Sequence, residues 1–409
     1  MLSVLLVLLM VSATHGGTKG TIRRELAVNY TGIKPPKGFA SPLFADKSFM
    51  YTICEPRWGD GLSCQIHVVK FDGPDEVHFF KYEPSPGRRI RAIYNPNFVR
   101  NGFFLLTTEV NVTKTKRVRS EYVSGMVFNP ALDELFKLEL PSDMYDQQMI
   151  ESAVESDELV VVLDGHTICG KFNRCVLRFN NQGQKIGEPI VFPIQSDRLE
   201  LSPIQGVSVD KGLFGIGTTQ KLKSFISQVF YVTANNEPIM LHTFDYLITN
   251  IQFSYTRDLY GICGINNHEP VIDTNEYNCL QYDWKLNKTT HFNINTTFGL
   301  TGGSVIMSIK NLNSNSLLLF SMECNIGQKE FNCSTARISV VNSYDQILRS
   351  KEILTDLECH NTDLISSGIT EINDEYCFYL SCLIAVDDPE QSYLHGSYLY
   401  VKCLPILDI

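Results

Sequence analysis

The sequence lacks two features that would point to familiar classes of function. After the N-terminus no stretch reaches 18 apolar residues, and the tail from Cys403 to Ile409 is no anchor, so we expect no membrane span. Positive charge is not in excess, because 35 Lys and Arg face 45 Asp and Glu, for a net charge of -10. General binding to nucleic acid is therefore not expected.

Strong catalytic motifs are also missing. The chain has no Gly-x-Ser-x-Gly, no His-Glu-x-x-His, no phosphate-binding loop ending in Gly-Lys-Ser/Thr, and no EF-hand loop. It also lacks the Cys-x-x-Cys spacing of zinc sites, so we expect no metal and no cofactor. The acidic loops 264–278 and 383–397 offer oxygen ligands for calcium, but solvated charge is the simpler interpretation.

The N-terminus predicts export from the cell. A short apolar core over 2–11 is followed by small residues at Ser12, Ala13 and Gly16, so residues 1–16 are expected to be a cleaved signal peptide. Twelve cysteines, an even number, all follow this segment. Together with five Asn-x-Ser/Thr sequons, they predict a secreted, extracellular glycoprotein. The sequons are at Asn29, Asn111, Asn287, Asn295 and Asn332.

Short apolar runs recur along the chain at a nearly regular spacing. The units begin near residues 47, 102, 157, 212, 257, 315 and 374. In each unit the apolar run, strand b, is followed by an alternating strand c, a strand d, and a strand a that leads into the next b. Asn, Asp, Gly and Pro separate these runs, which is typical of antiparallel hairpins. Helical periodicity is nearly absent.

This repeat resembles the β-propeller superfamily over nearly the whole of residues 17–409, predicted as a single domain. The resemblance concerns architecture, because repeated Trp-Asp pairs, kelch double glycines and the sialidase Ser-x-Asp-x-Gly box are missing. It implies an all-β fold of seven four-stranded blades. Six or eight blades, or two β-sandwich domains, are the alternatives. The last unit stops after its c strand, and residues 21–30 supply a d strand that would close the ring.

The cysteines are expected to form six intramolecular disulfides. In four pairs one cysteine ends a b strand and the other begins the neighbouring c strand, which brings them within bonding reach. These pairs are Cys54–Cys64, Cys169–Cys175, Cys263–Cys279 and Cys324–Cys333. For the last four cysteines, the alternation of strand direction favours the pairs Cys359–Cys382 and Cys377–Cys403.

Basic residues of the first two units form the candidate ligand site. Strand alternation brings the b–c loops and the d–a linkers to one face, where a cationic patch with an exposed Trp would suit an anionic ligand. Scattered solvated charge is the simpler interpretation of the same residues. The set consists of Arg57 and Trp58 in the first b–c loop, Arg88, Arg89 and Arg91 in the linker between the units, and Lys114, Lys116, Arg117 and Arg119 in the second b–c loop.

The function expected from these features is binding outside the cell. The ligand would be an extracellular protein, a glycan or another anionic molecule, including a sulfated polyanion. The alternative is a secreted hydrolase or lyase that acts on carbohydrate, and the architecture does not decide whether the chain is an enzyme. Catalysis would require groups such as Asp60, Asp164 and His166 to converge at the centre of the ring. A structural component of an extracellular matrix or coat is a third interpretation.

Overall fold

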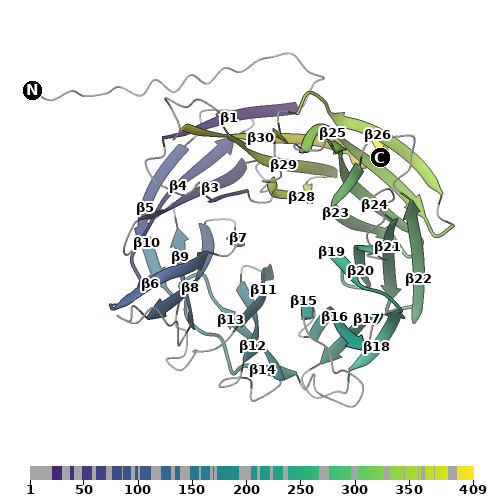
Figure 1. The fold of residues 1–409 in the computed structure, drawn as a ribbon, viewed down its shortest axis with the longest axis horizontal. Coiled ribbons are helices and arrows are strands. Elements are labelled where there is room, and N and C mark those ends of the chain that lie inside the picture. The colour runs from purple at the N-terminus through teal and green to yellow at the C-terminus, as the bar shows by residue number, and fades with distance from the viewer. Residues whose placement is uncertain are drawn as a thin grey trace, which may run out of the picture.

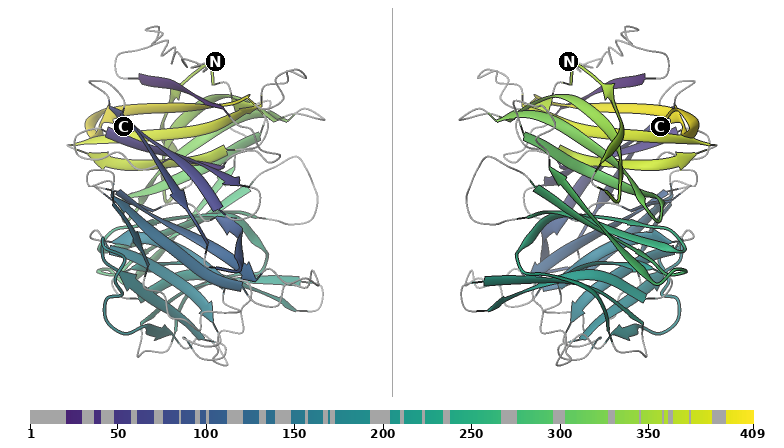
Figure 2. Two further views of the ribbon diagram at one scale, coloured as in Figure 1. Left: turned by 90° about the vertical axis from the view of Figure 1, so that its left-hand side faces the viewer. Right: turned by 90° about the vertical axis from the view of Figure 1, so that its right-hand side faces the viewer.

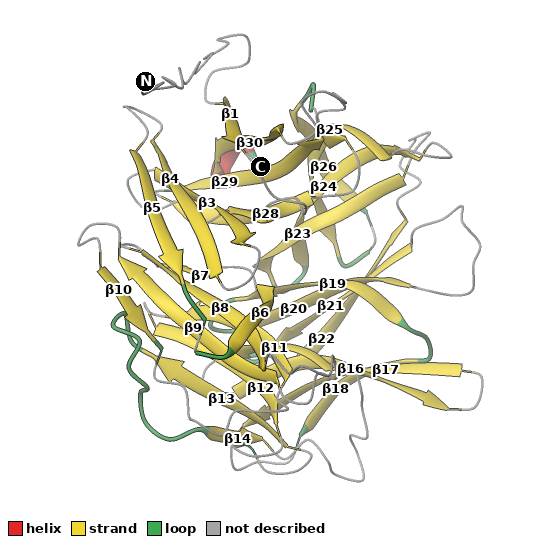
Figure 3. Cartoon of the chain, turned by 60° about the vertical axis from the view of Figure 1, so that its left-hand side comes forward, coloured by secondary structure: helices red, strands yellow, loops and turns green. Residues whose placement is uncertain are grey.

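The structure is a computed structural model, and within its described residues the chain is almost entirely β-strand (Figure 3). The one helical segment there is the 3₁₀ turn η1 (Ile406–Asp408). The described residues are 21–29, 37–40, 48–57, 61–70, 76–84, 86–93, 97–99, 102–111, 121–129, 134–138, 148–155, 158–165, 169, 173–192, 204–209, 212–221, 224–233, 238–266, 276–295, 303–326, 331–344, 346–357, 359–360, 364–372, 374–385 and 394–409.

The described strands form seven antiparallel sheets, and in each sheet four strands lie in the order a, b, c, d. The first sheet contains β2 (Lys37–Ala40), β3 (Ser48–Arg57), β4 (Gly61–Lys70) and β5 (Glu76–Tyr82). The second contains β6 (Arg88–Ile93), β8 (Gly102–Asn111), β9 (Glu121–Asn129) and β10 (Glu134–Lys137), with β7 (Asn97–Val99) also paired to β8. The third contains β11 (Gln148–Glu155), β12 (Glu158–Gly165), β13 (Asn173–Phe179) and β14 (Ile190–Phe192).

The remaining sheets follow the same order. The fourth contains β15 (Ile204–Val209), β16 (Gly212–Lys221), β17 (Ser224–Thr233) and β18 (Ile239–Phe244). The fifth contains β19 (Ile248–Tyr255), β20 (Leu259–Asn266), β21 (Glu276–Asp283) and β22 (Lys288–Asn295). The sixth contains β23 (Gly303–Asn313), β24 (Ser316–Ile326), β25 (Phe331–Asn342) and β26 (Ile347–Leu354), with β27 (Cys359–His360) also paired to β25. The seventh contains β28 (Leu364–Ile372), β29 (Glu375–Ala385), β30 (Leu394–Pro405) and β1 (Thr21–Asn29).

The sheets are arranged around a common axis, which is a β-propeller architecture (Figure 1). The apolar runs noted in the sequence form the b strands, the second strand of each sheet. Strands of this kind are covered on both faces by neighbouring sheets. In β12, for example, four successive residues from Leu159 to Val162 are all buried. An apolar run without alternation is what burial on both faces predicts.

The seventh sheet joins the first described strand to the last one. β1 pairs antiparallel with β30, so that Thr21 lies opposite Lys402 and Asn29 lies opposite Leu394. Both side views show this strand beside the C-terminal strands (Figure 2). Strand β28 of the same sheet contacts β2 of the first sheet and β23 of the sixth. The sequence prediction that residues 21–30 pair with the last c strand agrees with this register.

Strand alternation gives the sheets two distinct ends. We call the end that carries the b–c and d–a connections the loop end, and the end that carries the a–b and c–d connections the turn end. At the turn end, β21 leads to β22 through residues 284–287 and β23 leads to β24 through 314–315, whereas β13 leads to β14 through the longer stretch 180–189. At the loop end the connection from β20 to β21 spans 267–275. Each end thus carries both long and short connections, and the loop end also includes the two-residue connection 222–223.

An aromatic cluster holds the fourth and fifth sheets together. Phe214 of β16 is completely buried, and its ring centroid lies 5.4 Å from that of Tyr260 on β20. The indole of Trp284 lies edge-on to Tyr231, with centroids 4.7 Å apart, and edge-on to Tyr282 at 4.6 Å. Such tilted and edge-to-face pairs add to the stabilisation from burial of their apolar area.

A network of buried amides joins the fifth and sixth sheets. The side-chain nitrogen of Asn311, on β23, donates to the carbonyls of Ser254 and Leu259, at 3.0 Å each. The amide nitrogen of Gln281, on β21, donates to Asn311 Oδ1 at 3.1 Å and to the carbonyl of Asn313 at 2.8 Å. A Cβ atom at Gly261 would lie 2.4 Å from Asn311 Oδ1, so this position leaves no room for a larger side chain.

Candidate functional site

The structure places four of the nine predicted ligand-site residues. Arg57 is the last residue of β3, and Arg88, Arg89 and Arg91 lie within β6. This corrects the expectation that Arg57 lies in a loop and the other three in a linker. Gly87, with φ +78°, ends the preceding turn, and the chain is extended from the next residue onward. Trp58, Lys114, Lys116, Arg117 and Arg119 lie outside the described residues.

Arg88 forms an ion pair with a buried carboxylate. Its Nη1 atom lies 3.7 Å from Oε2 of Glu109, on the neighbouring strand β8, and the Glu109 side chain is completely buried while that of Arg88 is 27% exposed. Removal of the arginine would take away a cationic partner of a buried carboxylate, which is destabilising. Arg88 therefore serves the fold first, and its charge is not fully available to an anionic ligand.

Glu109 was not identified by the sequence reasoning. The signal for it was present, because an acidic residue within the apolar strand Gly102–Asn111 requires a cationic partner when the strand is buried. The strand pairing supplies that partner: Ile90 lies opposite Glu109, and Arg88 lies two residues away on the same strand. The pair thus links the a and b strands of the second sheet.

Three disulfides lie among the described side chains, and each joins a pair expected from the sequence. They are Cys169–Cys175, Cys263–Cys279 and Cys377–Cys403. The first two close b–c connections at the loop end, and the third lies at the turn end. Backbone register also sets Cys54 opposite Cys64 and Cys324 opposite Cys333.

No free cysteine occurs in the part of the chain that the structure describes. Cys333 and Cys382 are both disulfide-bonded. Besides facing Cys324, Cys333 lies opposite Cys359 in the short pairing of β25 with β27. The predicted bonds Cys54–Cys64, Cys324–Cys333 and Cys359–Cys382 stay predictions.

The five sequons divide unequally between the two ends. Asn29, Asn111 and Asn295 are the last residues of β1, β8 and β22, and Asn332 is the second residue of β25, which places all four at the loop end. Asn287 lies in the turn between β21 and β22 at the turn end, where it is exposed and has φ 47°. Its Oδ1 accepts a hydrogen bond from the Tyr282 hydroxyl. The bond uses the side-chain oxygen of Asn287 and does not involve the amide nitrogen, to which a glycan would be attached.

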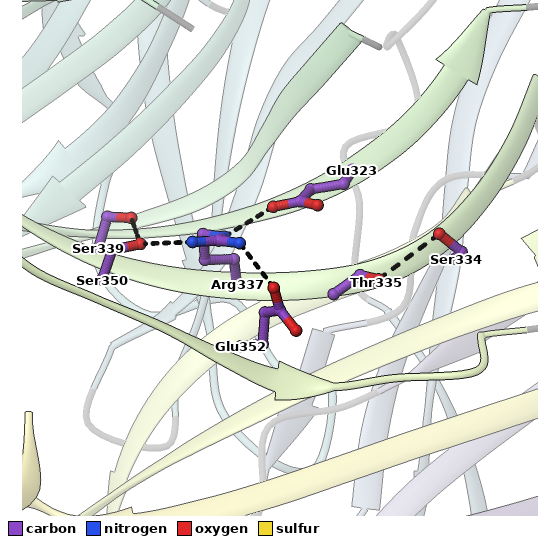
Figure 4. A network of polar contacts seen from close by, with 7 residues as sticks. All are labelled: Glu323, Ser334, Thr335, Arg337, Ser339, Ser350 and Glu352. Atoms are coloured by element: carbon purple, nitrogen blue, oxygen red, sulfur yellow. Dashed lines mark hydrogen bonds and ion pairs between the residues drawn. The ribbon is translucent and has the colours of Figure 1, made fainter. Parts of the chain in front are cut away.

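The clearest charged cluster in the described residues crosses three strands of the sixth sheet (Figure 4). Arg337 on β25 donates from Nε to Glu323 Oε1 on β24 at 2.6 Å and from Nη2 to Glu352 Oε1 on β26 at 2.7 Å. Its Nη1 atom donates to Ser350 Oγ at 3.2 Å. Because one guanidinium occupies both carboxylates, they brace the sheet and do not form an acid–base pair for catalysis.

The described residues contain one group of three side chains at metal-ligand spacing, formed by Glu375, Cys377 and Cys403. Its two sulfur atoms are joined to each other in a disulfide, so they are not thiolates that bind a metal. Glu276 begins β21 and Asp164 lies in β12, whereas Asp60, His166 and the segments 267–275 and 386–393 fall outside the described residues. The calcium site and the catalytic site therefore stay predictions.

Comparisons with known proteins identify similar folds and no family. No family model matches the chain, and no curated protein sequence matches it. Among solved structures, the neuraminidase-like protein of a little yellow-shouldered bat isolate from Guatemala is 11% identical, with a TM-score of 0.41 over 79% of this chain and 96% of that one. The WD40 domain of SCAP from fission yeast is 13% identical, with a TM-score of 0.40 over 92% and 96%.

A third similar structure is the Trypanosoma rangeli sialidase in complex with sialic acid. It is 8% identical, with a TM-score of 0.38 over 94% of this chain and 59% of that one. Identities and TM-scores this low carry no inference about activity or ligand. No helix in the described part of the chain is long and apolar enough to span a membrane.

Proposed function

We propose that the chain is a secreted, glycosylated β-propeller of seven blades, closed by β1, that binds an extracellular ligand through its loop end. The observation that carries this proposal is the position of two disulfides. Cys169–Cys175 and Cys263–Cys279 each bridge the base of a b–c connection. In the second pair the two cysteines are directly opposite in the strand register, so the bond fixes the base of the 267–275 loop.

A covalent bond at the base of a loop is what a binding surface requires. Long loops on a rigid scaffold present varied side chains, and a fixed base lowers the conformational entropy that binding removes. Disulfides are also typical of proteins that mature in an oxidising compartment, which supports secretion.

An anionic ligand is the class that the loop end suits best. The second b–c connection carries Lys114, Lys116, Arg117 and Arg119, and Arg57 ends the b strand of the neighbouring sheet. Local positive charge on a protein with a net charge of -10 attracts polyanions such as sulfated glycans. Arg88 is left out of this set because it neutralises Glu109.

Heparin chromatography of the secreted full-length protein tests the proposal. The variant K114S/K116S/R117S/R119S should lose most of the retention seen with the wild type at low salt. Retention of the wild type should fall as salt rises, since the Debye length shrinks to about 8 Å at physiological ionic strength. The melting temperature should not change, because surface charges contribute little to stability.

The matched control removes four positive charges from the turn end, in the variant K185S/R257S/K285S/K288S. Lys285 and Lys288 are both exposed, and Lys288→Ser keeps the sequon of Asn287 intact. The control should bind heparin like the wild type. Equal losses in both variants would show attraction by overall charge alone. Wild-type protein that flows through the column at low salt would contradict the anionic-ligand proposal.

A further inference from the structure

Two histidines meet at the outer rim between the fourth and fifth sheets. His242 lies on β18 and His291 on β22, the d strands of these two sheets. Their ring centroids are 4.2 Å apart, and the ring planes meet at 64°. The His242 ring also lies edge-on to Phe244, at 4.5 Å. Two imidazoles from adjacent sheets are thus in direct contact, next to the aromatic cluster that joins those sheets.

Among the described residues, little near the pair could balance added positive charge. The acidic group there that acts on His242 is Asp245, an exposed residue directly after β18. The phenols of Tyr231, Tyr260 and Tyr282 belong to the cluster between the sheets, and burial raises the pKa of Tyr282, so this phenol stays neutral. Lys288, on the same strand as His291, donates to Asn315 of the sixth sheet instead.

The environment favours the neutral form of both rings. Burial lowers the pKa of His242 below its ordinary value of 6.5, the second positive charge of a protonated His291 lowers it further, and Asp245 raises it. Burial also lowers the pKa of His291. Near neutral pH the two rings can therefore pack edge to face, whereas protonation of both would set two like charges in contact.

We propose that the His242–His291 contact is an acid-sensitive link between the fourth and fifth sheets, which packs their outer strands together when neutral and releases them when both rings are protonated. The link joins two separate sheets, so its loss changes the contact between blades and not the pairing within a blade. It requires no ligand, and it stands independently of the proposed binding function.

The direction of the pH effect follows from linkage. In the unfolded chain the two histidines bind protons near pH 6.5, whereas in the folded chain they bind them only at lower pH. Below about pH 6.5 the unfolded state therefore holds more protons, and stability rises with pH in that range. The stabilisation is fully present above the unfolded pKa and is lost as the pH falls through the lower pKa values of the folded protein.

Hydrogen exchange and thermal melting of the full chain between pH 7.5 and 5.0 test the link. After correction for the intrinsic pH dependence, amide exchange in 239–244 and 288–295 should increase in the wild type as the pH falls. One unit of pKa difference corresponds to a tenfold change in the opening equilibrium for each histidine. In the variant H242F/H291F, which keeps an aromatic ring at both positions, the increase should disappear.

A control and a second readout keep the test decisive. The variant H78Q removes an imidazole from β5, the d strand of the first sheet, and should leave the local increase unchanged. Should the double variant fail to fold, the single variant H291Q serves, with the pKa of His242 followed by NMR. That pKa should rise in H291Q because a neighbouring positive charge is gone. An unchanged His242 pKa, or the same exchange increase in wild type and H242F/H291F, would overturn the proposal.

Discussion

The fifth sheet faces two neighbours and is joined to each in a different way. Toward the fourth sheet it presents Tyr260, Ile262, Leu280 and Tyr282, which pack among other aromatic and aliphatic side chains. Toward the sixth sheet it presents an apolar layer that contains the buried amide of Gln281, which donates to Asn311 of the sixth sheet. The interface with the fourth sheet is mainly packing, with one hydrogen bond from the Ile248 backbone N–H to Ser227 Oγ at 3.1 Å. The interface with the sixth sheet adds a network of buried amide hydrogen bonds.

The difference indicates how each interface should respond to change. Aromatic packing has no strict geometry, so it tolerates small shifts but loses much when volume is removed. Buried amides specify one relative position of two sheets, and a single missing partner leaves polar atoms without hydrogen bonds. The first interface also has the two histidines at its rim, which gives it a dependence on pH.

The largest effect is expected from a cavity in the aromatic interface. Phe214 is completely buried, so Phe214→Ala should lower the free energy of unfolding by about 3–5 kcal/mol, through lost transfer energy and an unfilled cavity. Urea denaturation followed by circular dichroism measures this. Phe225→Ala is the matched control on β17, where the side chain is 38% exposed, and its cost should be below about 1 kcal/mol. Similar costs for both would mean that the cluster does not hold the sheets together.

A somewhat smaller effect is expected at the amide network. Asn311→Leu keeps the approximate volume but removes the amide that donates to the carbonyls of Ser254 and Leu259 and the oxygen that accepts from Gln281, whose amide keeps its bond to the Asn313 carbonyl. We expect a loss of about 2–4 kcal/mol, since each buried unsatisfied group costs about 1–3 kcal/mol. Asn315→Leu, in an exposed turn two residues after β23, is the control and should be nearly neutral. A neutral Asn311→Leu would contradict the view that hydrogen bonds hold this interface.

The smallest effect is expected from removal of the Asp245 charge, which should make the stability of the aromatic interface slightly more dependent on pH. Asp245 is the weakest of the three influences on His242 and the one that raises its pKa. Asp245→Asn should therefore lower the pKa of His242 slightly further, which an NMR titration detects. Because the gap from the unfolded value widens, stability should fall slightly more between pH 7 and 5 than in the wild type. A rise in the pKa of His242 in this variant would contradict the assignment of Asp245 as the group that raises it.

Much of the strand order can be predicted from the sequence. In runs such as Glu158–Leu163 and Ser316–Phe320, every residue after the first is apolar. A strand that is covered on both faces requires this composition. The pairing of residues 21–30 with the last sheet follows from counting strands, because the final unit lacks one. Disulfides between cysteines on the two strands of a hairpin can also be predicted, since antiparallel pairing brings the two residues close together.

Contacts between sheets could not be predicted in the same way. Gln281 and Asn311 lie on different sheets, as do His242 and His291, and their distances depend on how the sheets stack. For Arg88 the error was local. We expected Arg88 and the neighbouring arginines in the linker between the first two units, but the turn ends at Gly87 and these arginines already belong to β6. Its partner Glu109 became apparent only when the two strands were paired.

The pairing of β1 with β30 has a consequence for the timing of protein synthesis. The residues of β1 emerge from the ribosome before those of any other described strand, and their partner strand emerges last. At roughly 5–20 residues per second, β1 waits on the order of tens of seconds for its partner. The earlier sheets can form while the chain grows, whereas the seventh cannot be completed until translation has reached Leu394–Pro405. Until then β1 has no strand to pair with in its own sheet, so its backbone groups stay available to other strands or to water.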